Sequence, residues 1–167
     1  ASITSSAGTV DIIQKSKRAV IDWRSFNIEA GETTNFHQPS ASSVTLNRVN
    51  TPDPSRINGN LNANGKVILI NPNGVFFGQG SKVDVNGLVA TTADTNNDQF
   101  MRGKMNFNIA GNPNATVSNA GSITAGQAGL VGLVAPNVSN SGTIDAKMGR
   151  VTLGSGDTFT MDMYGDG

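Results

Sequence analysis

The sequence contains no cysteine and a single histidine, His37. Without cysteine, disulfide bonds and thiolate metal sites are excluded, so the fold depends on its core and its backbone pairing alone. With one histidine, the chain offers neither a histidine metal cluster nor a catalytic triad. His37 is therefore expected to be a loop or cap residue, and no metal or cofactor is predicted.

Charge of either sign is scarce and balanced. Twelve basic residues match twelve acidic ones, and charged residues make up 14% of the chain. The basic residues are scattered, whereas nucleic acid and anionic membranes select for basic patches. Nucleic acid is therefore not an expected partner.

Long apolar runs are missing as well. No run reaches the roughly 18 residues of a membrane helix, and the first four residues lack the basic and apolar regions of a signal peptide. The sequence is thus expected either to begin after a removed signal peptide or to belong to a soluble protein.

Turn-forming residues dominate what is present. The 167 residues include 20 glycines and as many asparagines, a composition typical of β-strands joined by turns rather than of helices. A chain of this length predicts one domain. Only a short helical turn around residues 98–104 is compatible with the pattern.

A repeat in the second half carries the strongest architectural signal. The segment Val-Ser-Asn-Ala-Gly-Ser-Ile-Thr-Ala at residues 117–125 recurs, with similar residue types, as Val-Ser-Asn-Ser-Gly-Thr-Ile-Asp-Ala at residues 138–146, an offset of 21 residues. A weaker copy is assigned to residues 83–91, and another begins at Gly59. In this alignment Asp84 and Asp145 occupy different positions of the repeat.

Three further segments, each opened by glycine, follow the repeat copies at residues 65–69, 129–133 and 149–153. A period near 20 residues built from short strands predicts a parallel β-helix, in which each coil stacks on the previous one. Equivalent apolar residues then form ladders inside the helix: Leu61, Ile123 and Ile144 on one face, and Val67, Val131 and Val151 on another. The alternative is a β-sandwich, whose turn spacing looks similar locally but does not require the 21-residue repeat.

Residues 93–115 interrupt this spacing and are predicted to leave the helix as an excursion. Within them, Met105, Phe107 and Ile109 alternate as in a strand with one apolar face. Because Val67 and Leu69 are expected to point inward, their neighbours on the same strand point outward and need a cover. The excursion is expected to cover these outward residues, which are Ile68, Ile70 and Val134.

The most distinctive segment is the Asn-Pro-Asn-Gly motif at residues 71–74, which lies between two apolar strands. Asn71 opens a turn, Pro72 pre-sets its second position, and Gly74 closes it, as a type I turn prefers. One interpretation is a structural corner that buries its asparagine side chains; the other is a recognition motif. The candidate functional residues are Asn71, Pro72, Asn73, Gly74, Val75, Phe77 and Gly78.

Four segments in a fixed order carry a resemblance to a known family. They are residues 19–28 (Ala-Val-Ile-Asp-Trp-Arg-Ser-Phe-Asn-Ile), 31–36, 43–49, and 57–78 with the Asn-Pro-Asn-Gly motif. The chain resembles, over nearly its whole length, the amino-terminal domain of two-partner secretion exoproteins, the filamentous-haemagglutinin-type adhesins and haemolysins of Gram-negative bacteria. The family often has a second Asn-Pro-Asn motif upstream, which is absent here. The copy at residues 112–114 lies downstream, inside the excursion, and is not equated with it.

This resemblance implies an all-β fold: a right-handed parallel β-helix with an amino-terminal cap and an extra-helical β excursion. A single secretion domain is expected over residues 1–167, divided into a cap and first coils (1–50), coils with the motif (51–92), the excursion (93–115) and regular coils (116–167). Because a helix ending at Gly167 would expose its last coil, the natural chain is expected to continue.

The resemblance also implies a task. The domain crosses the periplasm, is recognised by the POTRA domains of a dedicated outer-membrane β-barrel transporter, and starts export to the cell surface or medium. It is expected to be a monomer, with no small-molecule substrate and no enzymatic activity. Two rivals remain: a receptor- or glycan-binding adhesin module, and a polysaccharide-active enzyme, which needs acids gathered on one face.

Overall fold

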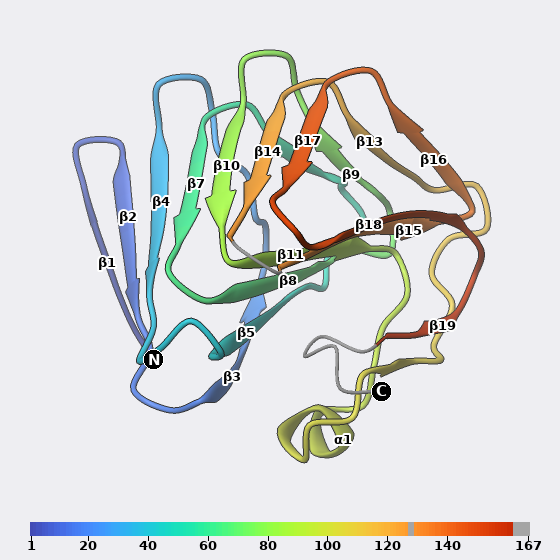
Figure 1. Ribbon diagram of the computed structural model, residues 1–167, viewed down its shortest axis with the longest axis horizontal. Helices are drawn as coiled ribbons and strands as arrows, with labels where there is room; N and C mark the ends of the chain where they lie inside the picture. Colours follow the sequence, from blue (N-terminus) through green and yellow to red (C-terminus); the bar gives the residue numbers. More distant parts are fainter. Residues whose placement is uncertain (127–128, 162–167) are drawn as a thin grey trace.

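The computed structural model describes residues 1–126 and 129–161, and these residues form a solenoid of short β-strands (Figure 1). Three sheets run along it. Sheet A contains β1 (Ser2–Ser6), β2 (Thr9–Ile13), β4 (Thr33–His37), β7 (Asn60–Ala63), β10 (Lys82–Val85), β14 (Ser122–Ala125) and β17 (Thr143–Ala146). Sheet B contains β3 (Arg18–Trp23), β5 (Val44–Val49), β8 (Lys66–Ile70), β11 (Gly87–Thr91), β15 (Leu130–Ala135) and β18 (Arg150–Ser155). Sheet C contains β6 (Ser55–Ile57), β9 (Val75–Phe77), β13 (Thr116–Asn119) and β16 (Asn137–Asn140).

The pairing within these sheets confirms the predicted right-handed parallel β-helix and rules out the sandwich. Apart from the antiparallel pair β1–β2, every strand pair in the three sheets is parallel and joins one coil to the next. Both predicted ladders form. Val83 lies between Leu61 and Ile123, with Ile144 next, and Leu88 lies between Val67 and Val131, with Val151 next.

One alignment of the repeat was wrong. Val83 pairs with Ile123, not with the position of Val117, so the weak copy at residues 83–91 was shifted in phase. The strand Lys82–Val85 buries alternate residues, and so do both strands of the repeat, Thr116–Asn119 and Ser122–Ala125. Alternation alone therefore cannot distinguish them.

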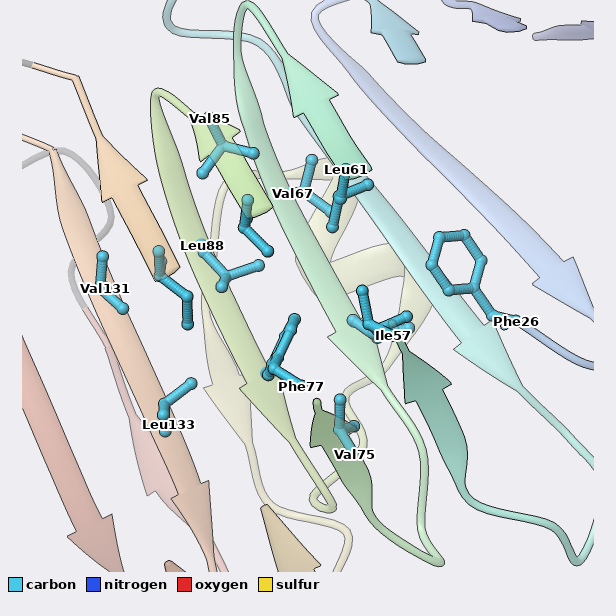
Figure 2. Packing of buried hydrophobic residues seen from close by; sticks show 14 of the residues in the cluster. Phe26, Ile57, Leu61, Val67, Val75, Phe77, Val85, Leu88, Val131 and Leu133 are labelled. Atoms are coloured by element: carbon cyan, nitrogen blue, oxygen red, sulfur yellow. The ribbon is translucent and has the colours of Figure 1, made fainter. Parts of the chain in front are cut away.

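The inward-facing residues of all three sheets form one continuous core. Figure 2 shows this cluster, with Leu61, Val67, Leu88 and Val131 among its labelled members. At its amino-terminal end, the Phe26 ring packs edge-on against Trp23 at 5.3 Å and stacks on Phe36 at 6.4 Å. These aromatic contacts lie in the first coils, where they close the core, and β1 adds an antiparallel cap strand beside β2.

Sheet B has a second apolar layer on its outside, formed by the excursion. Helix α1 (Asn97–Met101) and the strand β12 (Asn106–Phe107) lie there, and β12 pairs with β19 (Phe159–Thr160); α1 and β19 are visible outside the solenoid in Figure 1. This second core contains ten buried residues: Val44, Leu46, Ile68, Ile70, Val89, Ala93, Phe100, Met105, Phe107 and Leu130. The predicted cover over Ile68 and Ile70 is thus confirmed, because both are completely buried.

Two local predictions about the excursion need correction. Met105 and Phe107 are buried as expected, but Ile109 is 50% exposed, because it forms an isolated bridge with Asp94 rather than extending β12 over the core. The helical turn expected at residues 98–104 begins and ends earlier. Asn96 caps it, its side-chain oxygen accepting hydrogen bonds from the backbone N–H groups of Asp98 and Gln99.

Arg48 anchors the excursion to the solenoid. The Nε of Arg48, on β5, donates to both carboxylate oxygens of Asp94 at 2.9 and 3.0 Å, and its Nη2 donates to the Thr95 carbonyl at 3.0 Å. Only 12% of the Arg48 side chain is exposed. A hydrogen-bonded pair sheltered to this degree fixes the point where the chain leaves the coil.

Candidate functional site

The Asn-Pro-Asn-Gly motif is the corner between β8 and β9. The Gly74 N–H donates to the Asn71 carbonyl at 3.0 Å, and the Asn73 N–H donates to the Asn71 side-chain oxygen at 3.0 Å. Gly74 has a φ of +117°, a conformation that favours glycine. The turn predicted from the sequence is therefore present, and the asparagine side chain supports it from within.

Two asparagine side chains attach this corner to the preceding coil. The Asn71 Nδ2 donates to the Asp53 carbonyl and to the Ser55 Oγ, each at 3.0 Å, and the Asn73 Nδ2 donates to the Thr51 carbonyl at 3.1 Å. Asn71 is completely buried. Its amide satisfies backbone and hydroxyl groups that would otherwise be buried without partners, which is the structural interpretation of the motif.

The following coil covers the corner from the other side. The Asn112 N–H donates to the Pro72 carbonyl at 2.9 Å. A Cβ on Gly111 would lie 2.9 Å from the Pro72 Cα, and a Cβ on Gly74 would lie 2.7 Å from the Thr116 carbonyl oxygen. Neither glycine leaves room for a side chain, so the motif is packed between two coils.

The seven candidate residues therefore lie together, but most do not face solvent. Four of them are buried: Asn71, Gly74, Val75 and Phe77. The other three, Pro72, Asn73 and Gly78, are half-buried. A partner meeting the folded domain would find little of the motif except its backbone corner.

Phe76 is the outward-facing residue of the motif strand, and sequence reasoning missed it. It is half-buried on the outside of sheet C, with the Arg56 guanidinium 5.1 Å from its ring centroid. The strand Val75–Phe77 alternates with a period of two, so the pattern that turns Val75 and Phe77 inward also turns Phe76 outward.

A second turn of the same construction lies on top of the first. At residues 112–115, the Ala115 N–H donates to the Asn112 carbonyl at 3.1 Å and the Asn114 N–H donates to the Asn112 side-chain oxygen at 2.9 Å. Here Asn112, Pro113 and Asn114 are all exposed. The two Asn-Pro-Asn copies are thus neighbours in space, which their separation in the sequence concealed.

In every described coil that has a strand in sheet C, the chain turns into that strand at the same place. The segments leading into β6, β9, β13 and β16 stack in one column, and the Asn137 N–H donates to the Ala115 carbonyl at 3.2 Å to continue it. The whole excursion is an expansion of this corner, inserted between β11 and β13.

The acidic side chains in the described part of the chain are distributed over several coils. No group of three or more His, Asp or Glu residues within residues 1–126 and 129–161 is arranged to hold a metal ion. Contrary to the sequence alignment, Asp84 and Asp145 share one row of sheet A, since each pairs with Thr124 from opposite sides. With a threonine between them, they form no adjacent acid pair.

His37, expected to be a loop or cap residue, is the last residue of strand β4 in the amino-terminal coils. Its Nε2 is 2.8 Å from the Asp11 carboxylate, and the pKa of Asp11 is lowered by this hydrogen bond and by another from Asn35. This pair continues a polar row on the outside of sheet A, where the Asn62 amide donates to Asn35 at 3.0 Å. A shallow groove of about 420 Å³ lies along that row.

None of the helices in the described part of the chain is long and apolar enough to cross a membrane.

The comparisons with a family model, with curated proteins and with solved structures agree with one another. A family model described as the TPS secretion domain matches residues 1–164. A heme/hemopexin-binding protein of Haemophilus influenzae is 38% identical over 173 residues, covering 98% of this chain and 19% of that protein. Another heme/hemopexin-binding protein of the same species is 45% identical over 103 residues, covering 58% of this chain and 11% of that protein.

Among solved structures, the crystal structure of the HMW1 secretion domain from Haemophilus influenzae matches with a TM-score of 0.87 and 30% sequence identity, covering 97% of this chain and 44% of that chain. The chain thus spans about a fifth of the length of the first curated relative, 19%.

Proposed function

Because this chain belongs to the family of TPS secretion domains, we propose that it directs the export of a larger exoprotein through a cognate outer-membrane β-barrel transporter. The observation that carries the proposal is the family match over residues 1–164, supported by the fold similarity at a TM-score of 0.87. In this proposal the domain acts as a monomer, passes through the periplasm, is bound by the POTRA domains of the transporter, and ends outside the cell. The family and the fold are non-enzymatic in kind.

The solenoid suits folding in step with export. Each coil takes its backbone hydrogen bonds from the one before it: the Lys66 N–H donates to the Ser43 carbonyl at 2.8 Å, and the Lys82 N–H donates to the Gly59 carbonyl at 3.0 Å. A new strand therefore needs only the previous coil as a template. Emergence from a pore in sequence order matches this order of assembly, and folding outside opposes return.

For the motif at residues 71–74, we propose two successive roles. The transporter binds it while the chain is extended, and the motif then forms the corner of the folded coil. Burial of Asn71 supports this order, because its amide is accessible only before the coil closes. The flanking strands β8 and β9 are each paired on both sides in the folded domain, so addition of a transporter strand there likewise requires the unfolded state.

The proposal is tested by binding of the domain, held unfolded in urea and diluted rapidly, to immobilised POTRA domains of its transporter. Replacing Asn71 by alanine should reduce binding about tenfold or more, while the same change at Asn112, which has the same turn chemistry, should leave it unchanged. Export of the full exoprotein is measured in parallel. Binding that is lost equally in both variants contradicts a role for residues 71–74, and absence of any binding contradicts the function.

The alternative function, a glycan-binding adhesin module, is tested by a separate experiment. The groove on sheet A supplies a polar surface for a glycan, so the folded domain is also applied to a glycan array. Saturable glycan binding together with export that survives deletion of the domain would favour the adhesin module over the secretion domain.

For the exported protein as a whole, we propose binding of heme or hemopexin, as the names of both relatives indicate. The secretion domain itself is not expected to contribute, because its one histidine is exposed and already paired with Asp11. Retention of the full exoprotein, but not of residues 1–167, on hemin-agarose is the expected result. Retention of the isolated domain would contradict the proposal that heme binds outside residues 1–167.

A further inference from the structure

After the last coil, the chain returns across the outside of sheet B to the excursion. Strand β19 pairs antiparallel with β12, with Asn106 opposite Thr160 and Phe107 opposite Phe159. The Met161 N–H donates to the Met105 carbonyl at 3.0 Å, and the Thr160 Oγ1 donates to the Asn106 side-chain oxygen at 2.7 Å. Residues 156–161, which we call the strap, thereby lie against a segment that comes about 50 residues earlier in the chain.

The strap closes the second core with two alternate side chains. The Phe159 ring stacks on Phe107 with centroids 4.5 Å apart and planes inclined by 8°. Met161 lies over Gly132, where a Cβ would come within 2.7 Å of the Met161 Cε. Phe107 is fully buried in the closed state, so removal of the strap uncovers an aromatic ring and an unpaired strand edge.

The contact is nevertheless slight. The strand pair is two residues long, and a cavity of about 290 Å³ remains between the strap and sheet B, lined by residues that include Leu130, Val134 and Thr152. Two-residue pairing over an incompletely filled space contributes little stability compared with the six-residue parallel pair β15–β18. The strap therefore opens at less cost than the coil that precedes it.

Chain order makes the strap the last described part of the fold to close. Residues 106–107 are made and exported before residues 159–160, and β13 to β18 must form between them. During that interval the β12 edge has backbone groups without a partner and an uncovered Phe107. Such an edge binds an extended strand through its main chain and selects it by side chains at alternate positions.

We propose that, before the strap closes, the edge of β12 is a docking site for a transporter strand with apolar side chains two positions apart, and that closure of the strap releases it. The sequence Phe159-Thr160-Met161 is the internal counterpart of that ligand, because it places apolar groups on Phe107 and Gly132 with a polar residue between them. This inference rests on the proposed secretion function and adds a site and a release step to it.

A disulfide across the pair tests the proposal directly. Asn106 and Thr160 lie directly opposite each other, and the adjacent Met161-to-Met105 hydrogen bond makes theirs a non-hydrogen-bonded pair, whose close Cα spacing suits a disulfide. Since the chain has no cysteine, Asn106→Cys with Thr160→Cys creates a single defined cross-link. Binding of the folded domain to POTRA domains is then compared before and after reduction.

The expected result is that oxidation lowers POTRA binding about tenfold or more and that reduction restores it. Phe159→Ser, which loosens the strap, should instead raise binding severalfold, with circular dichroism showing an intact β-fold. A control cross-link joins Ser5→Cys and Val10→Cys, which face each other across β1 and β2 in the amino-terminal cap, and it should have no effect.

Equal binding of the oxidised and reduced strap variant, with the unmodified domain binding POTRA domains when it is diluted from urea, would overturn the docking site and leave the secretion function standing. If the unmodified domain also fails to bind POTRA domains in any state, the secretion function itself is overturned and the docking site with it. A synthetic peptide of residues 156–161 that fails to compete with POTRA domains for the Phe159→Ser variant would likewise count against the site.

Discussion

Two turns in this domain share the sequence Asn-Pro-Asn and the same pair of internal hydrogen bonds, yet one is buried and the other is exposed. In the turn at residues 71–74, the asparagine side chains reach the preceding coil, donating to Asp53, Ser55 and Thr51. In the turn at residues 112–115, the Asn112 side-chain oxygen accepts a hydrogen bond from within its own turn, and both asparagines are exposed. The local turn is therefore a property of the tripeptide, whereas attachment to a neighbouring coil depends on where the solenoid places it.

This difference separates the two interpretations of the motif. If residues 71–74 act only by forming a turn, equivalent substitutions in the two copies should have equal effects on folding. If attachment to the preceding coil matters, the buried copy should be far more sensitive. The two turns are thus matched controls for each other.

The loss of unfolding free energy should differ most between the two turns when the fourth position is substituted. Gly74→Ala places a side chain at a φ of +117° with its Cβ 2.7 Å from the Thr116 carbonyl oxygen, and it should lower the free energy of unfolding by about 4 kcal/mol. The second turn already has alanine there, and Ala115→Gly should cost about 1 kcal/mol. Urea denaturation followed by tryptophan fluorescence measures both.

A substitution at Gly80 distinguishes backbone strain from steric crowding as the cause of the stability loss at Gly74. It has a φ of +93°, but no atom lies within 4 Å of the place that a Cβ would take. Gly80→Ala therefore reports the conformational strain alone, about 1 to 2 kcal/mol. A loss at Gly74 no larger than the loss at Gly80 would show that contact with the following coil is unimportant.

The first asparagine should give the next largest difference. Asn71→Ala removes the turn bond and leaves the Asp53 carbonyl and the Ser55 hydroxyl buried without their donor, at a cost of about 3 kcal/mol. Asn112→Ala removes a solvent-exposed turn bond and should cost about 0.5 kcal/mol. Similar losses at both sites would mean that the turn, not the attachment, stabilises the coil.

A smaller contrast is expected at the third position. Asn73→Ala loses one half-buried bond to the Thr51 carbonyl, worth about 1 kcal/mol. The Asn114 side chain is exposed, and Asn114→Ala should fall within about 0.5 kcal/mol of the unchanged domain. The same urea titration measures both variants, and an Asn73 variant as stable as the Asn114 variant would confine the attachment to Asn71.

The sequence predicted those features that depend on residues close together in the chain or on a repeat. The 21-residue repeat indicated the parallel coils and the ladder of Leu61, Ile123 and Ile144, and the alternation around Ile68 predicted the outer cover. Turn chemistry predicted the corner at residues 71–74. Each of these follows from periodicity or from four adjacent residues.

The features that escaped prediction depend on contacts between distant segments. Stacking of the two Asn-Pro-Asn turns arises because the excursion is inserted at the same corner one coil later, and pairing of β12 with β19 joins segments separated in the chain by the strands β13 to β18. The phase of residues 83–91 was wrong because valine alternation suits several strands equally. Burial of Asn71 was one of the two interpretations of the motif, and the structure shows it. Its acceptors, Asp53 and Ser55, could not be named from the sequence because they lie in another coil.

Substitution of the proline should lower the free energy of unfolding by the same amount in both turns. Proline stabilises a turn mainly by restricting the unfolded chain, an effect that does not depend on burial in the folded state. The Pro72 carbonyl accepts the Asn112 N–H, and alanine at that position preserves the carbonyl. Pro72→Ala and Pro113→Ala should therefore each cost about 0.5 to 1 kcal/mol, measured by urea denaturation. A much larger loss at Pro72 would mean that its half-buried ring packs against neighbouring coils, and the buried turn would then differ from the exposed one in apolar contact as well as in hydrogen bonding.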